Sequence, residues 1–598
     1  MDPDDSTRNE AKPSIKSQFL DKVDAHLPSR SLTQDMRSPA ADEPSSQRLL
    51  NRIGLISGKT VAATLGKYAD VSPISPDQKD EFIDWQAMDF LLIVAQVLPF
   101  DEPWRRCFLN IEDEGFLLSR LLRRAKAHRV PSVLWVEEES EAIGMFAHLF
   151  DKVDHLMLPE GAEHGKSERV STLPVGVDVK SFNPLLPKAH MRRSRARFIG
   201  FLIDGAHEIG IKYGPERAYE AFKPFFEYNW WLTDSSNDLR NGDHKIHAAM
   251  RRRFLGSMRD SALSKPLQLA SGYFLPEALV SGRKRHAQRL YLSAGACKTC
   301  VVTDDPSFKQ DYISYTGDTE SLEAFRDWVL NDHIGREAVQ HLAWRQTLTH
   351  HSYFEVLKLT LSIVGIQARF SQPENPHVNV VVPTIRPDLI PFILKNVERQ
   401  KHDNLSLSIV INGAEVPADI RRLVDAHPFA SLYSMPGYKS IGYCINYGIE
   451  QSASDYWAKF DDDDIYGPDY LSDMLLQRKY VDFDITGKAA IFTYLEEFDR
   501  LHIRRLWTRD TLEPFIGGGT ILARTGTNMF PEDVRGYADT LYLTEAEERG
   551  YRILSSDPFN FAQVRRADPS SHTWTAGAHQ LNLKGPQRSG LNLSGVIL

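Results

Sequence analysis

Apolar runs of strand length alternate with amphipathic helical patterns from residue 51 onward. The run FLLIVAQVL at 90–98 predicts a buried strand, whereas FLLSRLLRRAKAH at 116–128 predicts a helix with one apolar face. The alternation continues with the strand-like runs SVLWVEE at 132–138 and HLMLP at 155–159. Strands that alternate with helices form parallel sheets with crossover helices. The first part of the chain is therefore predicted to be an α/β lobe.

The same alternation restarts twice further along the chain. ARFIGFL at 196–202 and CVVTDD at 300–305 predict strands of a second α/β lobe. The segment QARFSQPENPH has two prolines and no periodicity, and the strand-like VNVVVPT at 378–384 opens a third unit after it. The predicted domains are a flexible N-terminal tail, two lobes, a linker and a C-terminal α/β domain: 1–50, 51–190, 191–366, 367–377 and 378–598.

Composition and charge narrow the classes of function. The 598 residues are 42% hydrophobic and 25% charged, which excludes a globally disordered chain. The net charge of -9 gives no overall attraction to nucleic acid, so nucleic acid is not an expected partner. No secretory leader or membrane span is predicted, and four scattered cysteines do not form a disulfide framework. We therefore expect a cytoplasmic protein.

Four consecutive aspartates, Asp461 to Asp464, follow the apolar strand YWAKF at 456–460. Adjacent carboxylates repel one another unless a cation neutralises them. Mg and Mn take oxygen ligands and commonly share their coordination shell with substrate phosphates. A carboxylate cluster at the carboxyl end of a strand therefore predicts a site for a metal and a diphosphate. A solvated acidic loop is the alternative that the local sequence leaves open.

Three segments of the C-terminal domain together resemble the family-2 glycosyltransferases, whose fold is called GT-A. VVVPTIRP at 380–387 is similar to the strand and loop that hold the nucleotide in that family. IGYCINYGI at 441–449 is similar to a characteristic helix, and FDDDDIYGPDYL at 460–471 is similar to the DxD strand and the helix after it. The resemblance extends over 378–574. It implies a mixed-sheet α/β domain that transfers a sugar from a nucleotide sugar.

The resemblance also implies which residues bind the substrates. The nucleotide would be bound by Thr384, Arg386, Asn412, Asn446 and Asp461. A divalent Mn or Mg ion would be held by Asp461, Asp463 and His572, and neutral imidazole suits Mn better than Mg. The donor or acceptor sugar would lie against Asp464, Gly518 and Gly519. The two glycines belong to FIGGGTILART at 515–525, which is predicted to form a pair of strands.

Asp539 lies in a segment, 537–553, that is similar to the one carrying the catalytic acid of the family. The glutamate that usually precedes this acid is Ala538 here. The resemblance implies that Asp539 is the general base that deprotonates the acceptor hydroxyl, which predicts inversion of the anomeric configuration. Glu545 is the second choice for this role, and a helix cap is the structural alternative for Asp539.

The N-terminal half resembles a different group of glycosyltransferases, the CgeB-like branch (glycosyl transferases group 1) of the GT-B fold. The resemblance rests on LPVGVDVKSFNP at 173–184, FIGF at 198–201 and the triplet RLY at 289–291. It implies a GT-B-like unit of two Rossmann-like lobes over 51–365. Active members usually place a glutamate after the triplet to hold the donor ribose, but this chain has Leu292, whose side chain cannot accept a hydrogen bond. The usual donor binding of the family is therefore not expected at this triplet.

Charged clusters of the N-terminal half have two interpretations. The three glutamates at 137–139 close a predicted strand near the mouth between the lobes, where they either contact an acceptor or, as we expect, are exposed. Arg283, Lys284, Arg285 and Arg289 form either a solvated helix face or a site for a diphosphate. The CxxC at 297–300 has no second pair, so neither zinc nor redox chemistry is expected there.

These observations favour a metal-dependent glycosyltransferase that moves a sugar from a nucleotide sugar to a glycan or lipid-linked acceptor. Cell-surface polysaccharide or glycoconjugate synthesis is the expected setting, with peripheral association with membrane-bound synthesis machinery left open. The N-terminal half is then either an acceptor-holding platform or a second transferase of a polymerising enzyme. A non-catalytic glycan-binding scaffold and a nucleotidyltransferase are the competing classes.

Overall fold

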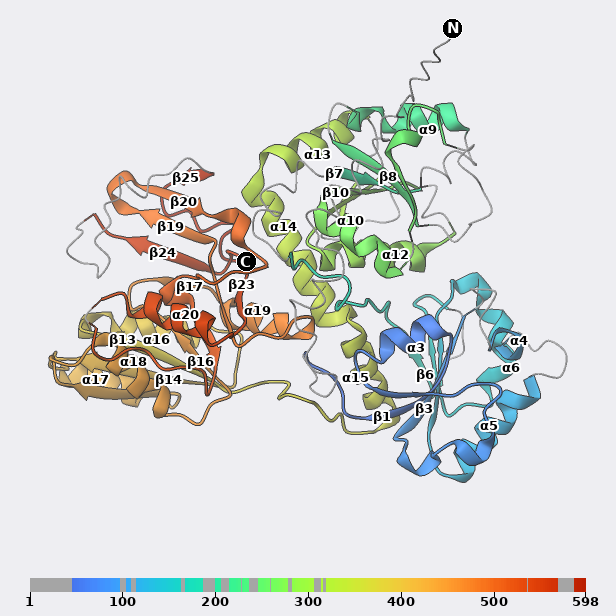
Figure 1. Cartoon of the computed structure of the whole chain (residues 1–598), viewed down its shortest axis with the longest axis horizontal. Helices are drawn as coiled ribbons and strands as arrows, with labels where there is room; N and C mark the ends of the chain where they lie inside the picture. Colours follow the sequence, from blue (N-terminus) through green and yellow to red (C-terminus); the bar gives the residue numbers. More distant parts are fainter. Residues whose placement is uncertain are drawn as a thin grey trace, which may run out of the picture.

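The computed structural model shows an α/β protein whose described residues form four sheets (Figure 1). Three large sheets follow one another along the chain, and a smaller sheet packs beside the last of them. The structure describes residues 46–96, 104–108, 115–162, 167–186, 199–205, 214–226, 229–235, 246–258, 260–277, 282–305, 313–315, 319–534, 536–567 and 586–598.

The first sheet is parallel throughout, in the order β2-β1-β3-β4-β5-β6. Its central strands are buried along their whole length because helices cover the sheet, which is why they consist of unbroken apolar runs. The strands are β1 (Arg52–Ile56), β2 (Asp70–Pro73), β3 (Phe90–Ala95), β4 (Ser132–Val136), β5 (His155–Leu158) and β6 (Val170–Thr172). The α-helices are α3 (Lys59–Leu65), α4 (Arg105–Phe108), α5 (Gly115–Ala127) and α6 (Ala147–Phe150).

The second sheet is also parallel, in the order β12-β11-β10-β7-β8-β9. In both sheets the chain runs outward from a central strand to one edge and then to the other, as in Rossmann-like folds. The strands are β7 (Ile199–Ile203), β8 (Trp230–Asp234), β9 (Phe254–Ser257), β10 (Ala270–Leu275), β11 (Cys300–Thr303) and β12 (Ile313–Tyr315). The α-helices are α9 (Pro215–Phe222), α10 (Ser264–Leu269), α12 (Lys284–Ala296) and α13 (Thr319–Asn331).

Two helices connect this half with the rest of the molecule. The helix α14 (His333–Gln346) lies between the second sheet and the C-terminal part, and α15 (Tyr353–Val364) returns to the first sheet (Figure 1). A Cβ on Gly176 would lie 2.4 Å from the Tyr353 ring, so only glycine allows this approach. The segment 367–377 contains no regular helix or strand but packs against the protein, with Phe370 tilted against Phe354.

The third sheet is mixed, in the order β15-β14-β13-β16-β22-β18-β23-β21. Strands β13 to β16 are parallel, and β22 pairs antiparallel with β16. The strands are β13 (Val378–Thr384), β14 (Leu405–Asn412), β15 (Ala430–Met435), β16 (Tyr456–Lys459), β18 (Ile485–Gly487), β21 (Thr511–Leu512), β22 (Leu522–Arg524) and β23 (Ile553–Ser555). The α-helices are α16 (Ile390–Glu398), α17 (Ala418–Asp425), α18 (Ile441–Glu450), α19 (Tyr470–Leu476) and α20 (Ala538–Glu548).

The fourth sheet has the order β17-β24-β19-β20-β25 and brings the end of the chain back to the aspartate segment. Its strands are β17 (Ile465–Tyr466), β19 (Ile491–Leu495), β20 (Arg500–Arg504), β24 (Phe561–Arg565) and β25 (Gln587–Ser589). One apolar core cluster includes Leu55, Leu202 and Val380, one from each large sheet, so the halves share a continuous core.

The predicted α/β class, with two parallel sheets before a mixed one, is confirmed. The predicted strand pair at 515–525 is wrong. Gly518–Thr520 form a 3₁₀ turn, η13, and only β22 follows it. The turn forms because Gly517 donates its N–H to Lys488 O and the Thr520 hydroxyl donates back to Gly517 O. All four cysteines are buried and free, and no helix of the described residues is long and apolar enough to cross a bilayer.

Candidate functional site

The carboxyl end of β16 delivers the four aspartates to the edge of the third sheet. Phe460 donates its N–H to Val381 O of β13 at 3.1 Å, and its ring stacks on Tyr466 with centroids 3.7 Å apart. The Tyr466 hydroxyl accepts the Asp461 N–H at 2.8 Å and donates to Gly519 O at 2.6 Å. One buried tyrosine therefore fastens the aspartate segment to the glycine turn.

Successive aspartates point in different directions. Asp462 is buried against β13 and accepts hydrogen bonds from the Thr384 hydroxyl and the Arg386 guanidinium. Asp463 pairs with the same Arg386 at 2.9 Å. Asp464 is buried and accepts the Val564 N–H at 2.9 Å. The side chain of Asp461 remains 35% exposed.

Asp539 approaches the aspartates from the first turn of α20, and its side chain is 37% exposed. A Cβ on Gly518 would lie 2.0 Å from Asp539 Oδ2, and one on Gly519 would lie 2.5 Å from Asp461 Oδ2. A side chain at either position would therefore require the facing carboxylate or the turn to move. The predicted residues Asp461, Asp464, Gly518, Gly519 and Asp539 come together around one turn.

Lys459, which the sequence analysis did not single out, lies among these acids. Its ammonium is 2.6 Å from Asp461 Oδ1 and 3.5 Å from Asp539 Oδ2. Burial alone would lower the pKa of Lys459, but Asp461 and Asp539 outweigh burial and raise it. The lysine is therefore charged at neutral pH. A lysine within the apolar strand YWAKF, directly before four carboxylates, is a signal that could have found it.

The electrostatics of the acids favour a cation. Burial raises the pKa of Asp463, although Arg386 opposes the shift. Burial also raises the pKa of Asp464, and the charges of Asp461 and Asp463 add to the shift. Burial raises the pKa of Asp539, against the opposing effect of Lys459. Carboxylates with raised pKa values lack full charge compensation, so a bound cation would stabilise their ionised forms.

The residues predicted to bind the nucleotide do not all lie close together. Thr384 and Arg386 lie together at the end of β13. Asn412, at the end of β14, donates its amide to Lys439 O at 3.0 Å, whereas its buried Oδ1 has no hydrogen-bond partner among the described residues. Asn446 is buried in α18, and its amide bonds to Phe530 and to the Glu532 carboxylate, so the structure does not bring it into the group. His572 lies outside the described residues.

A second charged cluster lies between the first and second sheets. The Glu137 side chain is 2% exposed and pairs with Arg285 at 3.2 Å and with Arg289. Burial alone would raise the pKa of Glu137, but Arg285 and Arg289 hold it below the ordinary value. Glu139 accepts the Arg285 and His286 N–H groups at 3.0 and 2.9 Å, at the N-terminus of α12. The expectation that these glutamates are exposed is wrong for Glu137, because the first and second lobes bury it in their contact and the two arginines compensate its charge there.

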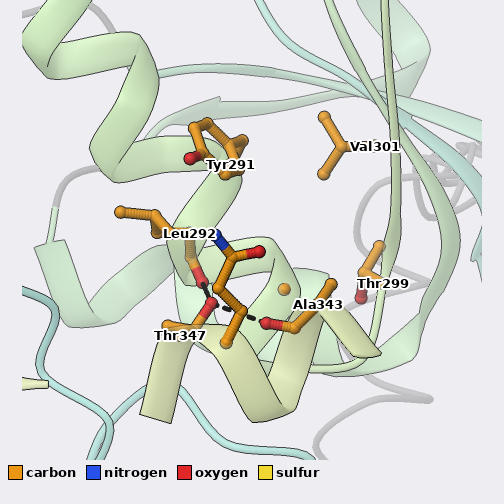
Figure 2. A pocket seen from close by; sticks show the side chains of 8 residues that line it. Tyr291, Leu292, Thr299, Val301, Ala343 and Thr347 are labelled. Atoms are coloured by element: carbon orange, nitrogen blue, oxygen red, sulfur yellow. Dashed lines mark hydrogen bonds between the residues drawn. The ribbon is translucent and has the colours of Figure 1, made fainter. Parts of the chain in front are cut away.

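Leu292 borders a small cavity between α12 and α14 (Figure 2). The cavity has a volume of about 10 Å³, and Leu292 is 1% exposed. The Thr347 hydroxyl donates to Ala343 O at 2.8 Å beside it. Such a volume is at the lower limit for one water molecule, so no ribose fits next to Leu292 in this arrangement.

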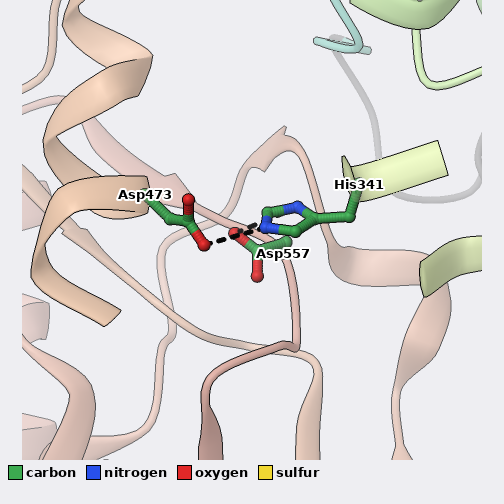
Figure 3. A group of neighbouring side chains, drawn as sticks. All are labelled: His341, Asp473 and Asp557. Atoms are coloured by element: carbon green, nitrogen blue, oxygen red, sulfur yellow. Dashed lines mark hydrogen bonds and ion pairs between the residues drawn. The ribbon is translucent and has the colours of Figure 1, made fainter. Parts of the chain in front are cut away.

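Three further titratable residues gather where α14 meets the C-terminal part: His341, Asp473 of α19 and Asp557 after β23 (Figure 3). His341 Nε2 lies 2.8 Å from Asp473 Oδ2. Arg345 donates to both oxygens of Asp473 at 2.7 Å, and Lys488 lies 3.3 Å from Asp557 Oδ1. Two cations therefore already face the two carboxylates. The group forms a buried ionic link between the halves of the chain and does not have the charge of a metal site.

Comparison with known proteins gives partial likenesses only. No family model matches this sequence, and no curated protein matches it. The mannosyltransferase PcManGT from Pyrobaculum calidifontis, solved with GDP-Man and Mn²⁺, is 17% identical over 39% of this chain and 68% of its own, with a TM-score of 0.26. Residues 1–349 of S. aureus TarS are 16% identical over 31% of this chain and 60% of that one, with a TM-score of 0.25. The same TarS fragment with UDP-GlcNAc gives a TM-score of 0.24. Likenesses at these TM-scores define neither the fold nor the function of this chain.

Proposed function

We propose that this chain is a glycosyltransferase that takes its sugar from a nucleotide sugar and reacts in its C-terminal part. The observation that carries the proposal is the convergence of Asp461, Asp464 and Asp539 on one glycine turn at the carboxyl end of β16. Open α/β sheets bind their ligands at that edge. The segments that resemble family-2 glycosyltransferases supply these acids and the strand beside them.

Asp461 and Asp463 are proposed to hold a divalent ion, Mn or Mg, with His572 as a further ligand. Their carboxylate oxygens suit either metal. The raised pKa of Asp463 supports the fit, because it marks a carboxylate that a cation would stabilise. When bound, the ion would supply charge neutralisation for the departing nucleoside diphosphate.

Thr384, Arg386 and Asn412 are proposed to contact the nucleotide at the ends of β13 and β14. The buried Asn412 Oδ1, which has no hydrogen-bond partner among the described residues, supports this assignment because a ligand donor would satisfy it. Arg386 holds Asp462 and Asp463, so it also orients the aspartate segment.

Asp539 is proposed to accept the proton of the acceptor hydroxyl. Its partly exposed carboxylate lies against the glycine turn, and its exposed side is proposed to face the acceptor. A base on the acceptor side, opposite the leaving group, gives inversion of the anomeric centre. Asp464, Gly518 and Gly519 are proposed to border the reacting sugar.

The N-terminal half, whose sequence resembles GT-B enzymes, is proposed to be a platform that holds the acceptor. Leu292 stands in place of the expected glutamate, and the cavity beside it is too small for a ribose. The acceptor class suggested by the resemblance is a glycan or lipid-linked saccharide of cell-surface polysaccharide or glycoconjugate synthesis. Peripheral association with membrane-bound machinery in the cytoplasm would fit that role.

The test is turnover of nucleotide sugars by the full chain. We would incubate UDP-, GDP-, CMP- and dTDP-sugars with Mn or Mg and follow the released nucleotide by chromatography. Wild type should slowly hydrolyse one of these donors, and this hydrolysis should require the metal. Asp463→Asn should abolish this turnover, and Asp539→Asn should lower it by about 10³ while nucleotide binding persists, because general-base catalysis contributes 10²–10⁴.

Asp425→Asn is the matched control, because Asp425 is an exposed aspartate at the end of α17. It should turn over the donor like wild type. Release of pyrophosphate instead of a nucleoside diphosphate would identify a nucleotidyltransferase. No release from any donor, with candidate acceptor glycans present, would overturn the proposal in favour of a glycan-binding scaffold.

A further inference from the structure

Lys459 connects two carboxylates that belong to different segments of the candidate site. Its ammonium lies 2.6 Å from Asp461 Oδ1, two residues further along the chain, and 3.5 Å from Asp539 Oδ2 in α20. The lysine side chain is 2% exposed, whereas those of Asp461 and Asp539 are 35% and 37% exposed. The ammonium therefore lies on the protein side of both carboxylates and leaves their outer faces open.

The glycine turn confines the same two carboxylates from another direction. Gly518 approaches Asp539 Oδ2 and Gly519 approaches Asp461 Oδ2 so closely that a Cβ at either position would displace the carboxylate or the turn. The Tyr466 hydroxyl ties the Asp461 backbone to Gly519. Each carboxylate is thus held between the ammonium and one residue of the turn.

A buried ammonium is costly to place in a strand that otherwise packs apolar side chains. Met or Leu would fill the same space without that cost. Among the described residues, Lys459 forms ion pairs only with Asp461 and Asp539, which compensate its charge. The arrangement therefore has a stability cost that a purely structural residue at this position would avoid.

We propose that Lys459 is a positioning residue that sets the separation and orientation of Asp461 and Asp539 relative to each other. The inference rests on the proposed function, in which Asp461 faces the donor and Asp539 faces the acceptor. Without the ammonium the two carboxylates repel each other and rotate toward solvent. A misplacement of about 1 Å in such a site is enough to cost on the order of a hundredfold in rate.

The test is a double-mutant cycle on donor turnover by the full chain. Lys459→Met keeps the length of the side chain and removes its charge. We expect kcat to fall about a hundredfold, whereas KM for the donor changes less than about tenfold. Asp539→Asn removes the carboxylate through which Lys459 acts. In that background Lys459→Met should lower kcat by no more than about twofold, because residues that act as a unit give non-additive losses.

Lys479→Met is the matched control, because Lys479 is also a buried lysine and pairs with Glu355 at 2.7 Å away from the site. It should lower the melting temperature and leave kcat unchanged at a temperature where the protein is folded. Calorimetry with UDP or GDP and Mn should show that Lys459→Met still binds the nucleotide that wild type binds.

The outcomes separate the two proposals. Wild type that turns over no donor contradicts the proposed function. If wild type is active and Lys459→Met has an unchanged kcat, the positioning role is contradicted. It is also contradicted if the losses in kcat from Lys459→Met and Asp539→Asn multiply in the double variant. If Lys459→Met does not fold, Lys459→Gln goes through the same cycle, because its amide keeps a hydrogen-bond donor while the charge is lost.

Discussion

Two clusters of opposite charges in this molecule lead to different conclusions. In the C-terminal part, Lys459 holds Asp461 and Asp539 while both carboxylates remain more than a third exposed. Between the lobes of the N-terminal half, Arg285 and Arg289 hold Glu137, whose side chain is 2% exposed. The first cluster leaves part of each of its acids exposed beside the glycine turn. The second uses its acid to join two lobes.

Charged residue types do not identify a site by themselves. Arg285 also donates to the carbonyl oxygens of Leu173 and Pro174, so its guanidinium is committed to the first lobe. The carboxylate of Glu139 occupies the N-terminus of α12, where an anionic ligand would otherwise bind. A group of charges can bind a substrate only where some of its bonding capacity remains free.

Among these substitutions, Glu137→Gln is expected to have the largest effect, on the stability of the contact between the lobes. The change leaves Arg285 and Arg289 without their buried counter-ion, and breaking a buried pair costs about 3 kcal/mol or more. The free energy of opening, measured by hydrogen exchange of α12 amides, should fall by this amount. Donor turnover in the C-terminal part should stay unchanged at temperatures where the chain is folded.

The pH dependence gives an independent check of the same pair. The folded-state pKa of Glu137 lies below its ordinary value of 4.5, so its ionised form stabilises the folded state above pH 4.5. This stabilisation is lost as the pH falls through the folded-state pKa. Protection of α12 should therefore decline below pH 4.5 in wild type and change less there in Glu137→Gln. An equal decline in both proteins would show that other groups control the contact between the lobes.

Gly518→Ala should have the next largest effect and act on the other cluster. The new Cβ would lie 2.0 Å from Asp539 Oδ2, so the carboxylate or the turn must move. We expect donor turnover to fall about a hundredfold, equivalent to about 2.7 kcal/mol in activation free energy. Gly144→Ala is the control, because a Cβ there meets nothing within 4 Å. Unchanged kinetics in Gly518→Ala would contradict the placement of Asp539 in the site.

The sequence alone predicted those parts of the fold that depend on the local pattern of apolar and polar residues. Unbroken apolar runs predicted the buried parallel strands, such as β3 and β4, because burial on both faces removes polar positions. The aspartates follow β16 as predicted, and Asp539 lies in the first turn of α20, whose N-cap residue is Tyr537. These features need only neighbouring residues to determine them.

The features that the sequence analysis missed depend on distant partners. Glu137 is buried because Arg289, 152 positions away, compensates its charge. The proposed role of Lys459 depends on its contact with Asp539, 80 positions away. The glycine turn forms because the Thr520 hydroxyl closes it and Lys488 accepts its N–H, which a strand propensity does not reveal. Pairings of this kind emerge only once the sheets are assembled.

The smallest effect is expected from Glu139→Gln in the N-terminal half. Glu139 is half-buried and stabilises the N-terminus of α12 by accepting two backbone N–H groups. Glutamine keeps an acceptor oxygen but loses the charge, so we expect a loss of about 1 kcal/mol at most in the free energy of α12 opening. Glu141→Gln, at an exposed glutamate of the same segment, should change nothing. A loss as large as that of Glu137→Gln would mean that the helix terminus, rather than the ion pairs of Glu137 with Arg285 and Arg289, holds the lobes together.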